Sequence, residues 1–366
     1  KTLKEFEKKY YKEELIVGDL LKFPEMSETF KSLIENGLRD FYEGSLAKRI
    51  LSDLSKTTSP LVKEDFVDYE ASFINPLSIS LKNACIYNLP PPTQGIASLL
   101  IHGIIDKNPQ IYNNESQFIH YLVEATKIAF RIRDAHITDP RYMTLKIEKF
   151  LKNENIEELS NEIDFKKAKP WSIDNKLGDT VWLGSIDQYG NAVSFIQSIY
   201  WEFGSGIFLP ETGITMQNRG ISFSLDKHNH NYLQPKRKPF HTIQPALAVF
   251  EDGRLMPYGT MGGDGQPQTQ AIIFSRYACM EKNLQDSINY PRWLLGRTWG
   301  DNNTKLRLEN RFDIKIVEEL KSLGHDIELV DDFDEIMGHA GALVRKQSGI
   351  IEAGFDYRSD GLAIGN

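Results

Sequence analysis

The spacing of apolar residues divides the chain into a helix-rich first part and a strand-rich second part. Apolar positions three and four residues apart predict helices over residues 24–37, 45–56 and 117–137. A further apolar helix opens after the turn at residues 93–95, and a short β-rich run over residues 80–89 precedes that turn. The first part therefore contributes mostly helices, with one short extended run near its middle.

The pattern changes sharply around residue 178. Residues 152–176 are polar and rich in Lys, Glu and Asn, which predicts a flexible connector without a buried face. Apolar and polar residues then alternate over residues 180–201 on both sides of a turn at residues 188–191, which is typical of a β-hairpin. Thr180 is therefore expected to begin a strand directly after a connector.

The remaining sequence predicts more strands and two helices. Apolar runs predict strands within residues 206–217, 246–260 and 341–356, and helical spacing predicts helices over residues 269–288 and 310–326. Strands that follow one another across short turns favour sheets built from hairpins and covered by helices.

Composition and charge narrow the classes of partner. The chain has 366 residues, of which 40% are hydrophobic and 26% charged, so it is long enough for one large core or two domains. Its formal net charge of −8 gives no general basic field for nucleic acid or an anionic membrane, and no apolar run reaches the roughly 18 residues of a membrane span. We expect a cytoplasmic protein with no cofactor, nucleic-acid or membrane partner. Because the chain starts at Lys1 without Met, an upstream segment, with any export signal, is expected to be missing.

Gly178-Asp179-Thr180, placed between a connector and a hairpin, is the arrangement expected of an enzyme that cuts its own chain to expose a nucleophile. The Thr180 hydroxyl would attack the carbonyl of Asp179, water would open the resulting ester, and the freed α-amine would serve as general base. An α-amine titrates at about 8, so a useful fraction is unprotonated near neutral pH. By spacing alone, a structural threonine at a strand start is the competing interpretation.

Several further segments, in the same order along nearly the whole chain, resemble the γ-glutamyltranspeptidase family. They are residues 18–20, 41–44, 89–95, 180–206, 236–254, 259–268 and 355–366. The resemblance implies an α+β protein with the four-layer αββα sandwich of N-terminal nucleophile hydrolases. It also implies a large-subunit portion at residues 1–179, incomplete at its N-terminus, and a small catalytic subunit at residues 180–366. Both would belong to one core and stay associated after cleavage, and a dimer of such heterodimers is compatible with this arrangement.

The resemblance implies roles for residues of the reaction centre. Thr180 falls on the family's nucleophile, with cleavage between Asp179 and Thr180, and Ser198 falls on a hydroxyl residue that supports it from the neighbouring strand. Gly262 and Gly263 fall on a pair whose N–H groups hold the oxyanion, and adjacent glycines present such groups without side-chain obstruction. The competing interpretations are a solvent-facing strand serine for Ser198 and a flexible turn or a phosphate loop for the glycines. The phosphate loop is rejected because the Walker spacing and its lysine are absent.

The sequence departs from the typical transpeptidase pattern around the substrate. His241 and Thr242 stand where the family has a Ser-Ser pair for the substrate's α-carboxylate, and His241 is either a donor to a carboxylate or a packed histidine. Arg219 stands in the segment that usually holds the substrate's amino group, and an arginine there prefers a carboxylate. Trp182 replaces a histidine and Tyr200 replaces a substrate-contacting asparagine, so both rings are candidates for lining an acyl pocket.

The resulting prediction is a self-processing acyl-transfer enzyme with a small-molecule substrate. Its amide is expected to be a γ-glutamyl one, as in glutathione, cleaved through an acyl-Thr180 intermediate that water or an acceptor amine resolves. Two alternatives stay open: an acylase of the same fold acting on glutaryl or cephalosporin-like side-chain amides, and an unprocessed, non-catalytic binding protein. No metal is expected, because His228 and His230 lack a third ligand nearby in the sequence.

Overall fold

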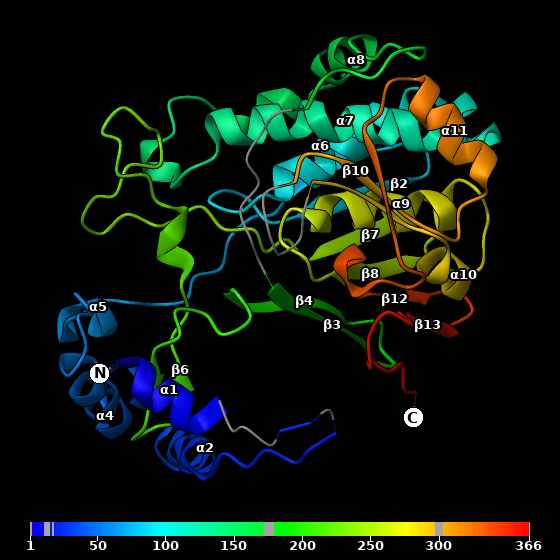
Figure 1. The fold of residues 1–366 in the computed structure, drawn as a ribbon. Coiled ribbons are helices and arrows are strands. Elements are labelled where there is room, and N and C mark those ends of the chain that lie inside the picture. Colours follow the sequence, from blue (N-terminus) through cyan, green and yellow to red (C-terminus); the bar gives the residue numbers. More distant parts are fainter. Residues whose placement is uncertain (1, 11–14, 17, 172–178, 297–302, 366) are drawn as a thin grey trace. The chain divides into compact units, whose positions relative to one another are not determined.

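The structure is a computed structural model that describes residues 2–10, 15–16, 18–171, 179–296 and 303–365 (Figure 1). The chain divides into two compact units. The first unit combines residues 1–74 with residues 201–218, and the second combines residues 75–200 with residues 219–366. Each unit has an apolar core of its own.

The first unit is a helical body with one short strand pair. Its elements are α1 (Thr2–Tyr10), α2 (Pro24–Asn36), α3 (Asp40–Glu43), α4 (Ser45–Ser55), α5 (Lys63–Val67), β5 (Phe208–Leu209) and β6 (Ile214–Thr215). The core contains Leu46, Ile50, Leu54, Phe66 and Leu209, so the predicted helix over residues 45–56 turns its apolar face inward. The two stretches of chain are also joined by a hydrogen bond of 2.7 Å from a threonine hydroxyl on α2 to the carbonyl of residue 212.

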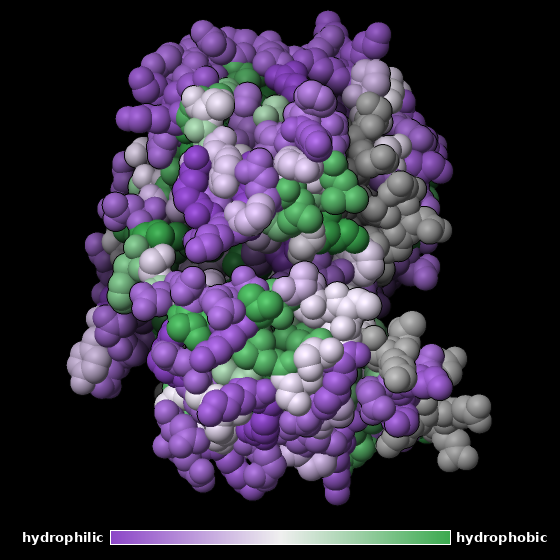
Figure 2. All heavy atoms as spheres, turned by 90° about the vertical axis from the view of Figure 1, so that its left-hand side faces the viewer, coloured by the Kyte–Doolittle hydropathy of each residue, from purple (hydrophilic) through white to green (hydrophobic). Residues whose placement is uncertain are grey.

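Hydrophilic residues cover most of the face of the molecule that Figure 2 shows, and hydrophobic residues appear there in smaller patches. Exposed apolar side chains of the first unit include Ile34, which is 82% exposed, and Leu38, which is 77% exposed. Scattered apolar residues of this kind are normal on protein surfaces. Among the described helices, none is long and apolar enough to cross a lipid bilayer.

The second unit is built on a six-stranded antiparallel sheet. In spatial order its strands are β1 (Leu77–Ser80), β2 (Ala84–Asn88), β7 (Ala246–Phe250), β8 (Leu255–Thr260), β12 (Ala340–Arg345) and β13 (Ile351–Phe355). Every neighbouring pair in this order is antiparallel. Strands from before and after the expected cleavage position therefore share one sheet, while the division into two subunits stays a prediction.

Helices cover one face of this sheet (Figure 1). They are α6 (Gly95–Asp106) and α9 (Gly265–Ala278), and α7 (Glu115–His136) packs against both of these helices. Residues 95–105 of α6 are all buried, because this helix is apolar around most of its circumference and contacts β1, β2, α7 and α9. α7 begins at the cap Asn114, whose side chain accepts a hydrogen bond from Gln117 N at 2.9 Å. The two helices predicted after residue 95 and over residues 117–137 are confirmed.

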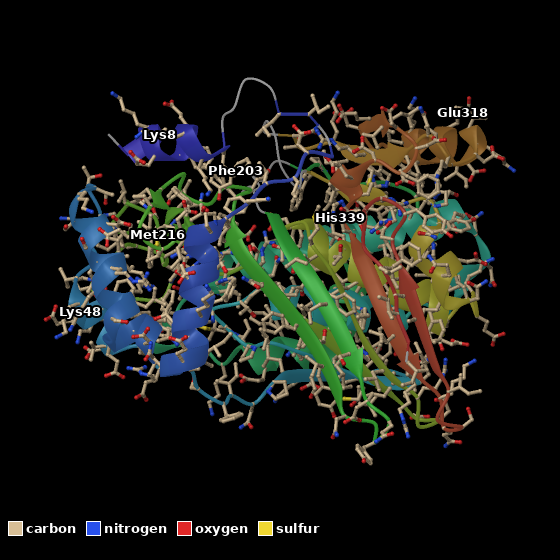
Figure 3. The ribbon with its side chains drawn as sticks, turned by 90° about the horizontal axis from the view of Figure 1, so that it is seen from below. Lys8, Lys48, Phe203, Met216, Glu318 and His339 are labelled. Carbon is tan, nitrogen blue, oxygen red and sulfur yellow. The ribbon has the colours of Figure 1, made fainter. Side chains whose placement is uncertain are left out.

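The other face of the sheet carries the predicted hairpin, β3 (Asp179–Ile186) and β4 (Ala192–Tyr200), whose two strands run side by side in Figure 3. Successive residues of a strand point to opposite faces, so Thr180, Trp182 and Gly184 share the inner face, and Val181 and Leu183 share the outer face. Val181 is 53% exposed and Leu183 is 47% exposed. The helices, the six-stranded sheet and the hairpin are thus three successive layers of this unit.

Glycines in the sheet make room for Trp182. A Cβ added to Gly259 would lie 2.2 Å from Trp182 Cδ1, and one added to Gly341 would lie 2.5 Å from Cζ3. Gly259 and Gly341 are partners in the register of β8 and β12. The indole Nε1 donates to Ser194 Oγ at 3.0 Å. These contacts fix the hairpin, and with it Thr180, against the sheet.

The prediction of one helix over residues 269–288 is wrong. The segment forms α9 and a separate helix, α10 (Leu284–Asn289). Between them Glu281 has a left-handed φ of 53°, and Asn283 caps α10 by accepting from Asp286 N at 2.7 Å. A local turn and a cap therefore overrode the helical spacing.

The predicted flexible connector contains the helix α8 (Asn153–Asn161). This helix buries Ile156 and Ser160, so a narrow apolar face was enough to hold it against the rest of the unit. The connector prediction is wrong for this stretch, and residues 172–176 lie outside the described part of the chain.

A small sheet near the C-terminal part of the chain was not predicted. It contains β9 (Trp293–Leu295), β10 (Leu306–Glu309) and β11 (Ile327–Val330), in the order β11-β10-β9. The predicted helix over residues 310–326 is confirmed as α11 (Ile314–Ser322), which connects the parallel strands β10 and β11. Strands of three or four residues are too short for an alternating pattern to reveal them.

Candidate active site

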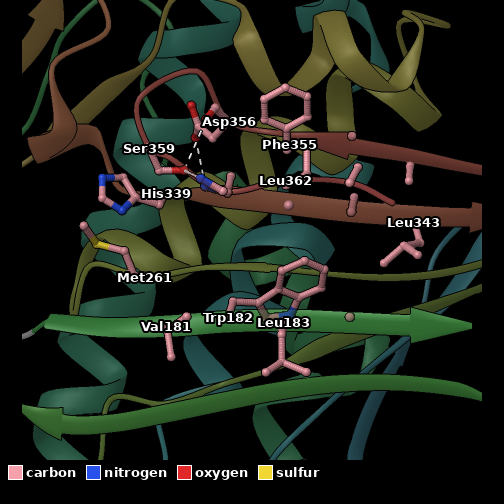
Figure 4. A pocket seen from close by; sticks show the side chains of 18 of the residues that line it. Val181, Trp182, Leu183, Met261, His339, Leu343, Phe355, Asp356, Ser359 and Leu362 are labelled. Carbon is pink, nitrogen blue, oxygen red and sulfur yellow. Dashed lines mark hydrogen bonds between the residues drawn. The ribbon is translucent and has the colours of Figure 1, made fainter. Parts of the chain in front are cut away.

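Thr180 lies on the inner face of β3 and lines a cavity of about 290 Å³ (Figure 4). The cavity runs along β3, β12 and β13, and its lining also includes Trp182, Met261, His339 and Leu362. Figure 4 shows Met261 and His339 at one end of the cavity and the ring of Trp182 between β3 and β12. The hydroxyl residue at the strand start therefore borders a space where a small ligand fits.

A β-bulge lies beside Thr180. The pairing register shifts between Asp179 and Val181, so that two residues of β4, Ser198 and Ile199, lie opposite Thr180 alone. Bulges bend a strand and redirect its side chains, and they are common beside active sites. Ser198 is half-buried on β4. The side chain of Asp179 lies outside the described part of the chain.

Arg219 connects Ser198 to Thr242. Its Nη2 donates to Ser198 Oγ at 3.2 Å, and its Nη1 donates to Thr242 Oγ1 at 3.0 Å. Arg219 is 4% exposed, and burial lowers the pKa of its guanidinium to about 10, so the side chain keeps its charge at neutral pH. The structure thus places the hydroxyls of Thr242 and Ser198 on the buried cation of Arg219, and none of these three residues is among those that line the Thr180 cavity.

The ring of Tyr200 lies against the guanidinium of Arg219, with 4.0 Å between the guanidinium carbon and the ring centroid. Such a cation–π contact contributes about 2 kcal/mol when it is desolvated. Tyr200 has a φ of 84°, which is strained for a residue with a Cβ, and its N–H donates to Ser198 Oγ at 2.9 Å. Its ring is fully buried and does not line the Thr180 cavity, so Tyr200 supports Arg219 instead of forming an acyl pocket wall.

His241 is a neutral histidine in this structure. Loss of hydration around its ring, with a smaller contribution from the charge of Arg219, lowers the pKa of the imidazole to about 3. Its Nδ1 accepts from Ile243 N at 3.2 Å, so the ring proton lies on Nε2. Its N–H donates to Pro92 O at 2.9 Å, and its carbonyl accepts from Gln94 N at 3.0 Å. His241 therefore brings a packed, uncharged ring to the site, and the positive charge beside it comes from Arg219.

Gly262 and Gly263 follow β8 in a turn that suits glycine. Their φ angles are 115° and 49°, both in the region that residues with a Cβ avoid. The carbonyl of Met261 accepts from Thr260 Oγ1 at 2.8 Å, and that of Gly262 accepts from Gly265 N at 2.6 Å. In a trans peptide the N–H and C=O groups point in opposite directions. The N–H groups of Gly262 and Gly263 therefore point away from Thr260 Oγ1 and Gly265 N, the donors to these two carbonyls.

Both of these N–H groups belong to buried residues, and no described residue accepts a hydrogen bond from either. Buried backbone N–H groups without a protein acceptor are rare and call for a functional explanation. Two adjacent donors of this kind, directly after the cavity residue Met261, suit the stabilisation of a tetrahedral oxyanion. The arrangement favours the oxyanion interpretation of Gly262 and Gly263 over that of a flexible turn.

Sequence reasoning missed three buried residues that hold these parts together. Gln94 donates from Nε2 to the carbonyls of Thr242 at 2.6 Å and of Gly263 at 2.7 Å. Arg133 donates from Nη1 to Gln94 Oε1 at 2.8 Å and pairs with Asp264 at 2.8 Å. The one available signal was that residues 89–95 resemble a family segment. These bonds connect Thr242, which also accepts a hydrogen bond from Arg219, to the turn at Gly262 and Gly263.

One group of described residues has the chemistry of a metal site. His120, Glu124 and His325 are buried and place ligand atoms within 4.8 Å of one another. His120 Nε2 lies 2.8 Å from the carbonyl of Asp164 and donates to it, so His120 Nδ1 accepts the Nε2 proton of His325 at 2.8 Å. Glu124 accepts from Lys127 Nζ at 2.7 Å. Protons and an ammonium already hold these ligand atoms, so the group is a hydrogen-bonded junction between α7 and the segment after α11.

This junction makes stability depend on pH. Burial, with the charge of Lys127, lowers the pKa of His325 to about 3, below the roughly 6.5 of an unfolded histidine. Between these values the unfolded chain binds a proton that the folded chain does not, so the free energy of unfolding falls as the pH drops from about 6.5 towards 3. Above about 6.5 this group has no effect. We expect a loss of about 1.4 kcal/mol per pH unit within the window, measured by urea unfolding at a series of pH values.

The matched variant for this prediction is His325→Gln. A glutamine keeps a neutral hydrogen-bonding side chain but binds no proton. The slope of the unfolding free energy against pH is therefore expected to lose the contribution of about one bound proton. His102, whose pKa burial lowers to about 4, remains in both proteins and accounts for part of the residual slope. An identical slope in the variant and the parent would contradict the assignment to His325.

Comparison with known proteins identifies relatives along the whole chain. The family profile described as Gamma-glutamyltranspeptidase matches residues 3–366. The chain is 47% identical over 348 residues to the oxamate amidohydrolase proenzyme of Klebsiella pneumoniae subsp. pneumoniae, a match that covers 95% of this chain and 66% of that protein. It is 38% identical over 352 residues to the glutathione hydrolase-like YwrD proenzyme of Bacillus subtilis, a match that covers 96% of this chain and 67% of that protein.

A solved structure of similar fold is a cephalosporin acylase from Bacillus halodurans, with a TM-score of 0.88 and 30% identity over 99% of this chain and 66% of that one. The chain spans about two thirds of the length of the relatives it matches. The predicted fold class, the α+β architecture of N-terminal nucleophile hydrolases, is confirmed by this likeness, and the described residues of the second unit form three of the four expected layers: helices, six-stranded sheet and hairpin. The protein belongs to the γ-glutamyltranspeptidase family of N-terminal nucleophile hydrolases.

Proposed function

We propose that the protein is an amidohydrolase whose substrate is a small amide with a carboxylate beside the scissile carbonyl, of which oxamate is the simplest. The observation that carries this proposal is the buried guanidinium of Arg219, held by Ser198 directly across the hairpin from Thr180. A relative named oxamate amidohydrolase, 47% identical over 95% of the chain, supports the same substrate class.

Arg219 favours a carboxylate over an amino group as the anchor of the substrate. A planar, permanently charged guanidinium matches the geometry of a carboxylate and repels an ammonium group. Because His241 is neutral, it does not compete with Arg219 for the negative charge. A γ-glutamyl substrate carries an α-ammonium group, whereas oxamate carries none. The charge in the site is therefore better matched by oxamate than by glutathione.

The proposed activation is cleavage of the chain before Thr180. The Thr180 hydroxyl attacks the carbonyl carbon of Asp179, the peptide C–N bond breaks, and an ester forms between the Asp179 carbonyl and the Thr180 oxygen. Water then opens the ester, which leaves a carboxylate on Asp179 and a free α-amine on Thr180. Nucleophile and general base then belong to one residue.

In turnover, the α-amine takes the hydroxyl proton of Thr180 while the oxygen attacks the amide carbonyl. The negative charge that develops on the carbonyl oxygen is held by the N–H groups of Gly262 and Gly263, and each such donor contributes about 3 kcal/mol of barrier reduction. The α-ammonium returns its proton to the leaving ammonia, and an oxalyl ester remains on Thr180. Water attacks this ester, so that oxamate and water give oxalate and ammonium overall.

Apolar side chains within the lining of the Thr180 cavity favour an acylase as the second candidate. Trp182 and Leu362 border the space, and a longer acyl group such as glutaryl would contact them. The chain also resembles a cephalosporin acylase in fold. The two candidates share every catalytic step and differ in the length of the acyl group.

Substrate competition tests the proposed function. Purified protein is first checked on a denaturing gel for cleavage before Thr180, and ammonia release from oxamate is then compared with hydrolysis of γ-glutamyl-p-nitroanilide and glutaryl-p-nitroanilide. We expect kcat/KM for oxamate to exceed that for the other two by about 100-fold or more, because a site built for one charged group rejects analogues strongly. A preference for the glutaryl compound would select the acylase, and a preference for the γ-glutamyl compound would overturn the proposal.

A further inference from the structure

The side-chain amide of Gln94 lies between the turn at Gly263 and Thr242, the residue whose hydroxyl accepts a hydrogen bond from Arg219. Gln94 is fully buried, and its Nε2 donates to both Thr242 O and Gly263 O, at 2.6 and 2.7 Å. Its Oε1 accepts from Arg133 Nη1 at 2.8 Å. A guanidinium only donates and carbonyl oxygens only accept, so these three partners fix which end of the amide is which.

On one side, Gln94 holds the peptide unit that follows Gly263. The carbonyl of Gly263 also accepts from Gln266 N, but at 3.3 Å, so Gln94 provides the shorter of the two bonds. Gly263 has a φ of 49° and no side chain, so its neighbouring peptide planes rotate at little steric cost once that bond is lost. Such a rotation would move the adjacent N–H donors of the candidate oxyanion site.

On the other side, Gln94 holds Thr242, whose Oγ1 accepts from Arg219. The two protons of one NH₂ group therefore fix the separation between the glycine turn and the residue that holds the cation. Arg133 keeps the amide in place, because it is itself fixed by Asp264 and by the ring of Phe130, 3.9 Å from its guanidinium carbon.

Building on the function proposed above, we propose that Gln94 is a positioning residue that sets the distance between the oxyanion donors and the carboxylate anchor Arg219. In oxamate the scissile carbonyl and the carboxylate are on adjacent carbons. A fixed separation between the two binding groups therefore selects one acyl length over others. Gln94 touches neither group of the substrate and acts through Gly263 and Thr242.

The test is Gln94→Met, which keeps the length of the side chain and removes both donors. We expect kcat for oxamate to fall about 100-fold, since a displacement near 1 Å has that effect on catalysis. We also expect the ratio of kcat/KM for oxamate to that for succinamate, whose acyl chain is two carbons longer, to fall about 10-fold or more. A loss of folded protein alone would lower both rates equally and leave this ratio unchanged.

Gln270→Met is the matched control. Gln270 is also fully buried, donates from Nε2 to Gln244 O at 2.7 Å and accepts from Ser98 Oγ at 2.7 Å. Its loss should destabilise the protein to a similar extent without changing the ratio. An unchanged ratio in Gln94→Met, or an equal change in both variants, would overturn the positioning role.

A crystal structure of Gln94→Met gives a result that does not depend on the substrate. A rotated Gly263 carbonyl supports the inference, and an unmoved one overturns it. If the parent protein does not hydrolyse oxamate, the proposed function fails, while this structure still decides the role of Gln94. Gln94→Asn, which is shorter by one methylene, serves for both measurements if the methionine variant does not fold.

Discussion

Replacing Thr180 by alanine is expected to leave the chain uncut and to lower amide hydrolysis by at least about 10⁴-fold, because both the nucleophile and the base of the reaction are lost together. The hydroxyl that attacks Asp179 is absent, so no α-amine is released. Mass spectrometry of the purified chain measures the cleavage, and ammonia release from oxamate measures the turnover. Thr180 sits in a bulged hairpin beside a cavity, and alanine fits that backbone without strain, so folding should persist.

Thr180→Ser is the matched variant. It keeps a hydroxyl at the same position, so cleavage and turnover should both survive at reduced rates. Val193→Ala, at an exposed position of the neighbouring strand β4 that does not line the cavity, should leave both activities close to those of the parent. Cleavage before residue 180 in Thr180→Ala, or hydrolysis at the parent rate, would remove Thr180 from the mechanism.

Replacing Arg219 by methionine is expected to lower kcat/KM for oxamate by about 30- to 4000-fold, equivalent to about 2 to 5 kcal/mol. The substrate carboxylate would enter a site without its counter-charge, and burial makes an unpaired charge costly. Methionine fills similar space against the ring of Tyr200. Steady-state kinetics on variants first shown to be cleaved before Thr180 measure the effect. Acetamide, which has no carboxylate, should be hydrolysed by parent and variant at similar low rates.

Two comparisons separate this effect from general damage. Arg219→Lys keeps the charge but not the planar pair of donors to Ser198 and Thr242, so it should restore part of the lost kcat/KM. Arg254→Met removes another arginine that stacks on an aromatic ring, Phe250, at 4.3 Å and should not change the kinetics. Equal losses for oxamate and acetamide in Arg219→Met would show that Arg219 does not bind the carboxylate.

The candidate site depends on buried polar groups that each have a specific partner. The cation of Arg219 is held by two hydroxyls and a ring, and the turn at Gly262 and Gly263 is held through its carbonyls. The N–H groups of Gly262 and Gly263 point away from these bonds, because the carbonyl oxygen on the opposite side of each peptide plane accepts the hydrogen bond. Preorganised donors of this kind stabilise a developing charge without rearranging during the reaction.

Much of the fold could be predicted because it follows from local patterns. The alternation over residues 180–201 predicted the hairpin, the apolar run after the turn at residues 93–95 predicted α6, and helical patterning predicted α7 and α11. The errors came from short-range and packing effects: Asn283 caps a separate helix, and Ile156 anchors α8 inside a polar connector. Strands as short as β9 left no readable period in the sequence.

For the site, the sequence by itself determined which chemical groups are present: a threonine after Gly-Asp at a strand start, a Gly-Gly turn, and an arginine where the family usually binds an amino group. These features are local, so spacing and resemblance reveal them. Only the tertiary structure decided how they meet. Gln94 contacts residues 148 and 169 positions away, and Arg219 reaches Ser198 across 21. The physical reason is that burial and hydrogen-bond partners are properties of the packed chain, so the roles of Gln94, Arg133 and Tyr200 exist only once distant segments are in contact.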